Sequence, residues 1–297
     1  MTRGMICISE SGKKISVIIV SYNSGDVIDN CLASVFRNND IGGGLEIIVV
    51  EQSREDTLYR RLAETYPGIT LIRAENRGFG AGNNRGAEAA KGEILFFLNP
   101  DTVLEESLFS FAAEKFDRDP RLGLMGVRVL SEKGNNISYN MLFPLGLASK
   151  LKFAARRKAD RFDERQMYIE GADMIVRRDV FAQIGGFDEK IFMYGEETDL
   201  CLQIREAGYT VQYFGEKSLR HLQGKCTEDR YPAVYTRQLD SLIYVYRKHG
   251  FDDRKWLRRE VRYQKCRGIA MRLAGKKKEA ALSGELAGIA ESRLQPV

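Results

Sequence analysis

Three acidic residues that could perform proton transfer lie close together, at Glu196, Glu197 and Asp199. They open the segment 196–207, whose apolar residues and terminal Gly208 predict a helix. Acids in the first turn of a helix stabilise it through the macrodipole, so a purely structural role is one interpretation. Three acids within four residues exceed what a helix cap needs, however, and we expect their repulsion to raise the pKa of at least one carboxyl group. A carboxyl group of that kind can act as a general base near neutral pH.

A fourth acid, Asp101, follows the apolar run 94–98, which lies between Gly92 and Pro100. A short apolar run with such boundaries predicts a buried strand of a parallel sheet, covered on both faces. Because Pro100 cannot donate a hydrogen bond to a neighbouring strand, the strand must end there. Asp101 then lies at its carboxyl end, where open α/β sheets bind ligands. Alternatively, Asp101 caps a helix predicted over 104–116, and these residues alone do not decide between the two roles.

Histidine and cysteine limit the metal sites that the chain can build. With only His221 and His249, a multi-histidine site is excluded. A lone histidine is usually structural, but beside Asp101 and a substrate diphosphate, His221 would complete an oxygen-rich site for Mg²⁺ or Mn²⁺. The five cysteines contain no Cys-x-x-Cys pair, which is typical of a reduced cytoplasmic protein rather than of a disulfide framework or a zinc site.

The elements that must position these side chains alternate along the chain. Apolar and β-branched runs predict strands at 14–20, 45–50, 69–73, 94–98 and 122–130. Helices are predicted between them, at 26–37, 55–65, 80–90 and 104–116. This alternation is typical of a parallel α/β sheet. Further along we expect strands over 168–177 and 209–214, and helices over 178–184, 196–207 and 235–248.

Two segments do not fit this alternation. The segment 76–86 holds four glycines, but a dinucleotide-binding fingerprint is rejected because Asn83 occupies its sixth position and the segment follows the third strand. Its glycines could expose backbone amides to a phosphate or could let the following helix pack closely. The segment 140–167 has no clean period, and we interpret it as a mobile or partly helical excursion over a pocket.

The composition excludes several classes of protein. No apolar run approaches the roughly 20 residues that span a bilayer, and 1–14 lack the apolar stretch of a secretory signal. Between Arg247 and Ala280 there are 13 Lys/Arg and 4 Asp/Glu, so the basic excess belongs to the C-terminal tail. Such a tail can contact anionic lipid, nucleic acid or an acidic polymer, or can be a solvated helical surface. Its few aromatic residues do not form a stacking platform, which argues against nucleic acid.

Several of these segments together resemble the family 2 glycosyltransferases, which have the GT-A fold. The resemblance covers about 14–225 and is carried, in the order of the family, by 16–23, 45–53, 76–86, 98–102, 185–189 and 194–208. Within the family, the chain is most similar to bacterial rhamnosyltransferase-type members. The resemblance implies a GT-A domain over 14–225, with a Rossmann-like, mostly parallel central sheet flanked by helices. A helical, basic C-terminal extension would follow over 226–297.

The resemblance also implies which residues bind the nucleotide-sugar. We expect these to be Ser21, Tyr22, Asn23, Glu51, Ser53, Asn76, Gly78, Asn83 and Asn99. The family usually has Asp-Asn-Ala-Ser after the second strand, where this chain begins with Glu51. Because Glu keeps the carboxylate but adds a methylene, the preferred nucleobase stays open.

Metal and catalytic roles follow from two further motifs. Where the family has Asp-x-Asp, only the final Asp101 remains, and the resemblance implies that it binds the metal together with His221. The Glu-Asp pair of the family is here Glu196 followed by Glu197. The catalytic base falls on Glu197, with Glu196 as a substitute, and Asp199 would support the acceptor or the base.

The reaction implied is an inverting, metal-dependent transfer of a hexose-type sugar such as rhamnose. The donor would be a nucleoside-diphosphate sugar, and the acceptor a lipid-linked saccharide or a cell-surface polysaccharide. We expect a cytoplasmic enzyme whose basic tail binds the inner face of the membrane peripherally. The alternatives are a catalytically impaired nucleotide-sugar-binding protein of the same fold, and a nucleotidyltransferase or other nucleotide-sugar enzyme on a similar sheet.

Overall fold

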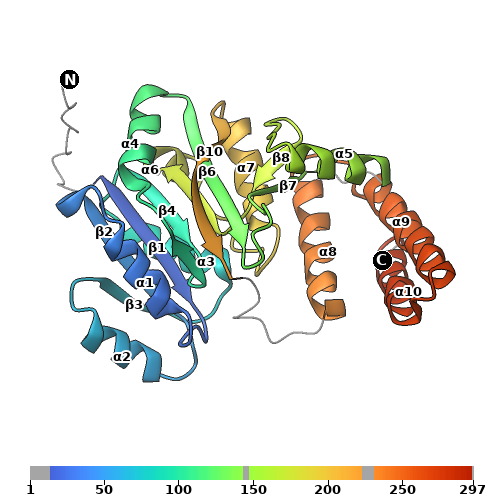
Figure 1. The fold of residues 1–297 in the computed structure, drawn as a ribbon, viewed down its shortest axis with the longest axis horizontal. Coiled ribbons are helices and arrows are strands. Elements are labelled where there is room, and N and C mark those ends of the chain that lie inside the picture. Colours follow the sequence, from blue (N-terminus) through green and yellow to red (C-terminus); the bar gives the residue numbers. More distant parts are fainter. Residues whose placement is uncertain (1–13, 143–146, 223–230, 296–297) are drawn as a thin grey trace. The chain divides into compact units, whose positions relative to one another are not determined.

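The computed structural model describes residues 14–142, 147–222 and 231–295 (Figure 1). The chain forms two compact units, each of which is considered by itself. The sheet unit comprises Met1–Asn140, Tyr168–Phe192 and Glu196–Thr227, and the helical unit comprises Met141–Met167, Met193–Gly195 and Glu228–Val297. The division into domains at 225/226 that the sequence suggested stays a prediction.

Within the described residues, the sheet unit contains one eight-stranded sheet, in the order β3-β2-β1-β4-β9-β6-β10-β5. Its first half is parallel and consists of β1 (Ile15–Ser21), β2 (Leu45–Glu51), β3 (Thr70–Arg73) and β4 (Ile94–Leu98). Every residue of β1 and β4 is buried. This accounts for their nearly continuous apolar sequences, because a central parallel strand is covered on both faces.

The second half of the sheet contains both parallel and antiparallel pairs. This corrects the expectation that the strand at 94–98 has parallel neighbours on both sides. The neighbour of β4 on one side is β1, which is parallel, but on the other side it is β9 (Asp173–Arg177), which is antiparallel. Beyond β9 lie β6 (Leu122–Ser131) and β10 (Thr210–His221), which are parallel to each other. β5 (Thr102–Leu104) forms the edge and is antiparallel to β10.

Helices follow the strands in the predicted alternation. They are α1 (Ile28–Arg37), α2 (Thr57–Thr65), α3 (Phe79–Ala89), α4 (Phe109–Arg118), α6 (Arg178–Gln183) and α7 (Glu196–Glu206), with a short 3₁₀ helix at Gly42–Gly44. The predicted helix over 104–116 begins later, at Phe109, because β5 occupies 102–104. Asp101 therefore does not cap that helix, and the capping interpretation is wrong.

The glycines of α3 let this helix approach the sheet closely. A Cβ at Gly82 would lie 2.8 Å from Val20 Cγ1, and one at Gly86 would collide with Ile18 Cγ2. Both neighbours belong to β1, so side chains at these positions would push the helix away from the sheet. Of the two roles that the sequence left open for these glycines, close packing is the one with direct structural support.

The segment 140–167 is more regular than its sequence suggested. It contains the end of β7 (Tyr139–Met141), α5 (Leu147–Lys158) and the beginning of β8 (Met167–Ile169), and β7 pairs with β8 in a two-stranded sheet. The partly helical interpretation is thus confirmed for 147–158, whereas 143–146 lie outside the described residues.

The helical unit is built from α5, α8 (Tyr231–Lys248), α9 (Asp253–Leu273) and α10 (Lys277–Ser292). Figure 1 shows α9 and α10 as a hairpin, joined at the short turn 274–276. Tyr246 and Trp256 pack edge to face between α8 and α9, with ring centroids 5.0 Å apart. None of the helices in the described ranges is long and apolar enough to cross a membrane.

Candidate active site

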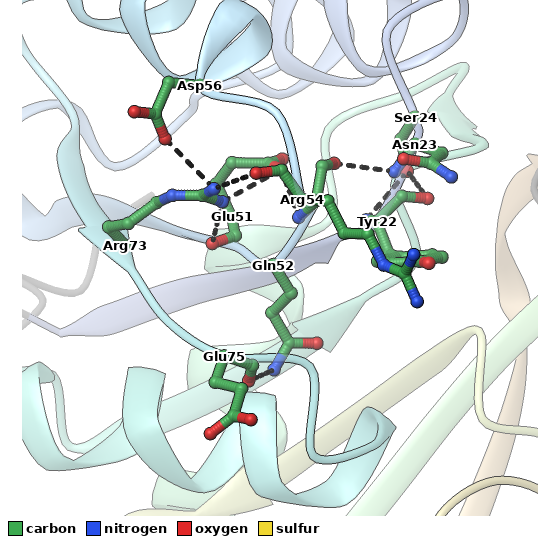
Figure 2. A network of polar contacts seen from close by, with 10 residues as sticks. Tyr22, Asn23, Ser24, Glu51, Gln52, Arg54, Asp56, Arg73 and Glu75 are labelled. Atoms are coloured by element: carbon green, nitrogen blue, oxygen red, sulfur yellow. Dashed lines mark hydrogen bonds and ion pairs between the residues drawn. The ribbon is translucent and has the colours of Figure 1, made fainter.

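The carboxyl ends of three neighbouring strands meet at one edge of the sheet. In register, Ser21 of β1 lies opposite Glu51 of β2, and Glu51 lies opposite Arg73 of β3. The loops after β1 and β2 are joined, because the Asn23 amide donates to Ser53 Oγ at 2.8 Å (Figure 2). Asn23 has a positive φ of 53°, a conformation that asparagine tolerates better than most residues. The predicted residues Ser21, Asn23, Glu51 and Ser53 thus come together in one place, and Tyr22 lies in the same loop.

Glu51 is the acidic residue at these strand ends, and it has no exposed surface. Its Oε1 accepts a hydrogen bond from the Ser53 amide at 2.6 Å and lies 3.8 Å from Arg73 Nη1. Arg73 is held on its other side by Asp56, at 3.0 Å, and by the Arg54 carbonyl, at 3.1 Å (Figure 2). Glu51 Oε2, however, has no hydrogen-bond partner among the described residues. A buried carboxylate oxygen without a donor is costly, so this atom is suited to accept an N–H group from a ligand.

Arg73 was not anticipated from the sequence, although a signal was present. It is the last residue of a predicted strand, on the same edge as Glu51, and parallel neighbours place their carboxyl ends together. Gln52 was also overlooked: it is buried and donates to the Glu75 carbonyl at 3.2 Å. This bond ties the end of β2 to the loop that leads into α3.

The glycine-rich loop before α3 is fixed by backbone contacts. Gly78 has a φ of 107°, and a Cβ there would collide with the Phe192 carbonyl. The Phe79 amide donates to that same carbonyl at 3.0 Å, so one amide at the start of α3 is already used. Asn76 Oδ1 accepts from the Gly78 amide at 3.2 Å, and Asn83 is buried and donates to the Phe79 carbonyl at 3.0 Å. The nucleotide-sugar roles of these residues stay predictions.

Asp101 and His221 lie together although 120 residues separate them in the sequence. His221 Nε2 is 3.0 Å from Asp101 Oδ1, and both side chains are largely buried. The pairing arises because β10 ends beside β5, where His221 lies opposite Thr102, and the Leu222 amide donates to the Asp101 carbonyl at 2.9 Å. Asn99 completes the group, with Nδ2 at 3.5 Å from His221 Nε2.

This group can accommodate a divalent cation. Two ligands next to each other around an octahedral ion, each about 2.1 Å from it, lie about 3.0 Å apart, which matches the distance between Asp101 Oδ1 and His221 Nε2. Asn99 Oδ1 is buried and has no hydrogen-bond partner among the described residues, so a further oxygen is available. Within the described part of the chain, no group of three or more His, Cys, Asp or Glu side chains is arranged so that it could hold a metal ion. A cation there would therefore depend on its substrate for the remaining ligands.

The acids at the start of α7 differ in their surroundings. Glu196 and Asp199 are buried, and Asp199 Oδ2 accepts from Gln203 Nε2 at 2.7 Å, one turn along the helix. Glu197 is half-buried, and its Cβ lies beside Gly171, where an added Cβ would be 3.9 Å away. Of the three acids, Glu197 is the one whose side chain is neither buried nor fully exposed, as a base that meets a substrate must be.

Asp173 is a third residue near the site that was not singled out from the sequence. It lies on β9 opposite Leu98, next to Asn99, and is completely buried. Burial raises the pKa of its carboxyl group well above the ordinary value, although the Val127 amide donates to Oδ2 at 2.6 Å. Burial at this position therefore disfavours the charged form of the Asp173 carboxyl group.

Comparison with known proteins agrees with this geometry. The family model described as Glycosyl transferase family 2 matches residues 16–185. The N-acetylglucosaminyl-diphospho-decaprenol L-rhamnosyltransferase of Mycobacterium tuberculosis is 23% identical over 283 residues, which cover 86% of this chain and 90% of that protein. The rhamnosyltransferase WbbL of Escherichia coli K12 is 24% identical over 214 residues, which cover 66% of this chain and 79% of that protein.

A solved structure shares the fold. The mannosyltransferase PcManGT from Pyrobaculum calidifontis, in complex with GDP-Man and Mn²⁺, superposes with a TM-score of 0.64 and 16% identity, covering 95% of this chain and 86% of that one. The expected GT-A architecture with its helical C-terminal part is thereby confirmed. The expected likeness to bacterial rhamnosyltransferases is confirmed by the two relatives above.

Proposed function

Since the chain belongs to glycosyl transferase family 2, we propose that it is an inverting, metal-dependent glycosyltransferase that uses a nucleoside-diphosphate sugar. The observation that carries this proposal is the pairing of Asp101 with His221 at 3.0 Å, at the sheet edge where the buried Glu51 lies. A carboxylate–imidazole pair can hold a cation against the diphosphate of a nucleotide-sugar. A buried oxygen that accepts a hydrogen bond, such as Glu51 Oε2, suits the nucleobase. These are the two polar ends of a nucleotide-sugar.

The nucleoside would lie over the ends of β1, β2 and β3. Glu51 Oε2 accepts an N–H group of the base, while the Ser53 amide and Arg73 hold the other carboxylate oxygen in place. Because only one oxygen of Glu51 lacks a partner among the described residues, the site favours a base that presents one imide N–H in this position. Uracil and thymine meet this requirement.

Asp101 and His221 would hold Mg²⁺ or Mn²⁺ against the diphosphate, with Asn99 at their side. When bound, the cation neutralises negative charge on the leaving diphosphate. The protein's own contribution is to fix both ligands before the donor arrives. His221 is held at the end of β10 and Asp101 by the Leu222 amide, so little order is lost on binding.

Proton transfer is assigned to Glu197. Its carboxylate removes the proton from an acceptor hydroxyl as that oxygen attacks the anomeric carbon of the sugar. The bond between this carbon and the diphosphate oxygen breaks in the same step, and the nucleoside diphosphate leaves with the bonding electrons. A single displacement of this kind inverts the anomeric configuration. Asp199, held by Gln203, supports the first turn of α7, and Glu196 is the alternative base.

The transferred sugar is proposed to be rhamnose or a related hexose, because the named relatives are rhamnosyltransferases. The acceptor is proposed to be a saccharide, either lipid-linked or part of a cell-surface polysaccharide. A lipid-linked acceptor would place the enzyme in the cytoplasm, at the inner face of the membrane, with its basic C-terminal part in contact with the surface.

A panel of uridine-, thymidine- and guanosine-diphosphate sugars, incubated with Mg²⁺ or Mn²⁺, tests this function. We expect metal-dependent release of the nucleoside diphosphate that is accelerated by a saccharide acceptor. Tight binding of a donor without any turnover would instead favour the alternative, a catalytically impaired nucleotide-sugar-binding protein of the same fold.

A further inference from the structure

We propose that the tip of the α9–α10 hairpin, residues 269–278, is a docking surface for an anionic lipid bilayer. This proposal names the residues that would contact the membrane. It rests on the proposed function in one respect, which is that a lipid surface is the expected partner. All residues of the tip belong to the helical unit, and the experiment below measures binding rather than sugar transfer.

The first observation is an exposed apolar stripe on α9. Ile269 is 60% exposed and Leu273 is 85% exposed. Their spacing of four places them on the same face of the helix, and the exposed Cys266 precedes them on that face. Earlier in the same helix the pattern is reversed, because the polar residues Glu260 and Gln264 are buried. The end of α9 therefore presents apolar side chains to solvent, whereas polar side chains are buried earlier in the helix.

The second observation is a group of cations around this stripe. Arg272, Lys276, Lys277 and Lys278 are all exposed, and none forms an ion pair with any residue in the described part of the chain. The sequence has no acidic residue between Glu260 and Glu279. Glu279, in the first turn of α10, is the nearest acid in the sequence to these four cations. Apolar side chains within a mainly cationic group match the interface of an anionic membrane, where apolar side chains insert between headgroups and cations bind phosphate.

The third observation is that the lysines lie where a helix disfavours them. Lys276 is the N-cap of α10, and Lys277 and Lys278 are in its first turn. The macrodipole places partial positive charge at this end, so cations here destabilise the helix. The amides of Lys276 and Lys277 already donate to the Met271 and Gly275 carbonyls, so the three lysine side chains are the groups that lipid phosphate would bind.

Other occupants fit less well. A second copy of the chain would bring two cationic tips together, and their repulsion opposes association. Nucleic acid would gain little from Ile269 and Leu273, and the nearby aromatic ring, Tyr263, is already covered by Lys150 Nζ at 3.3 Å from its centroid. An anionic bilayer uses both the charge and the apolar side chains.

Flotation of the full chain with vesicles tests the proposal. Vesicles of phosphatidylcholine with 30% phosphatidylglycerol are compared with vesicles of phosphatidylcholine alone. We expect binding to the anionic vesicles, weakened about 10-fold by Ile269→Ser with Leu273→Ser and roughly 10- to 100-fold by Lys→Gln at 276, 277 and 278. Raising the salt concentration should weaken binding of the wild type more than that of the triple variant.

Matched controls separate the tip from general charge and hydrophobicity. Leu151→Ser changes another leucine of the helical unit that is 63% exposed, and Lys→Gln at 133, 158 and 190 removes the same charge from exposed positions elsewhere. Both controls should bind the vesicles within about threefold of the wild type, because none of the changed residues belongs to the tip at 269–278. Circular dichroism verifies that each variant is folded.

Three results would overturn the proposal. The first is equal flotation of the wild type and both tip variants, and the second is equal loss in the tip variants and their controls. The third is a wild type that does not bind vesicles but self-associates in sedimentation or binds an oligonucleotide, with that association lost when Leu273 is replaced by serine. Donor hydrolysis in the absence of vesicles is measured in parallel, so that a failure of the proposed transfer reaction is recognised separately from a failure of lipid binding.

Discussion

The substitution Glu51→Gln tests the nucleotide end of the site with a minimal change of shape. The new amide can keep the hydrogen bond from the Ser53 amide through its oxygen. Its NH₂ group then replaces Oε2, the atom that lacks a hydrogen-bond partner within the described residues. The NH₂ group of the glutamine would then face the N–H group of the base, so that two hydrogen-bond donors meet. A charge-assisted hydrogen bond worth about 1.5–3 kcal/mol would be lost. We therefore expect the affinity for a uridine or thymidine diphosphate to fall roughly 10- to 150-fold.

The same strand provides a matched control at its other end. Glu46, also on β2, accepts hydrogen bonds from Ser16 Oγ at 2.5 Å and from the Gly92 amide at 3.1 Å. Glu46→Gln removes the same charge far from the carboxyl edge of the sheet and should leave nucleotide affinity unchanged. Isothermal titration calorimetry with nucleoside diphosphates measures both variants. Glu51→Gln should not destabilise the protein much, since it removes a buried charge. Wild-type nucleotide affinity in a folded Glu51→Gln variant would refute the role of Oε2.

Three further predictions concern the metal ligands, the packing of α3 and the buried Asp173. Asp101→Ala and His221→Ala should each abolish most of the increase in nucleoside-diphosphate affinity that Mn²⁺ produces, which calorimetry with and without the ion measures; an unchanged increase would contradict the assignment. Gly86→Ala should destabilise the protein by about 1–2 kcal/mol in urea unfolding, because overpacking against Ile18 exceeds the gain in helix propensity. The control Gly284→Ala, which meets no atom within 4 Å on α10, should be neutral or stabilising by up to about 1 kcal/mol. Asp173→Asn should be stabilising, increasingly so as the pH rises above about 4, by at most about 1.4 kcal/mol per pH unit. The sign follows because burial raises the pKa of Asp173 in the folded state. The contribution of this carboxyl group to the stability of the wild type is therefore fully present below the unfolded pKa and is lost as the pH rises through the folded pKa. A difference between Asp173→Asn and wild type that stays constant from pH 4 to 8 would contradict this.

Much of the site could be predicted because the sequence shows where several strands end. Pro100 marks the end of β4, and the polar residues after β1 and β2 mark two more ends on the same edge of the sheet. The role of Asp101 could not be settled locally, since Asp-Thr before an apolar segment also matches a helix cap. Only the tertiary pairing of β5 with β10 decides it, because that pairing brings His221 to Asp101.

Other features depended on contacts that a sequence pattern does not carry. The five residues of β9 are apolar enough for a buried strand, but nothing in their order gives a direction, so its antiparallel position next to β4 could not be foreseen. Asp173 likewise passed as an ordinary strand residue, because the sequence does not show that the sheet buries it completely and so raises its pKa. The helix α5 lies in a segment without a clean apolar period, since most of its described residues are exposed or half-buried.

The assignment of the base to Glu197 is the central claim about mechanism, and one comparison tests it most directly. Steady-state transfer is measured for Glu197→Gln beside Glu196→Gln, with donor affinity determined separately. We predict that Glu197→Gln lowers kcat by about 10²–10⁴-fold, corresponding to roughly 3–5 kcal/mol, while donor binding stays close to that of the wild type. Near-full transfer by Glu197→Gln, together with loss of transfer in Glu196→Gln, would contradict the assignment and move the base to Glu196.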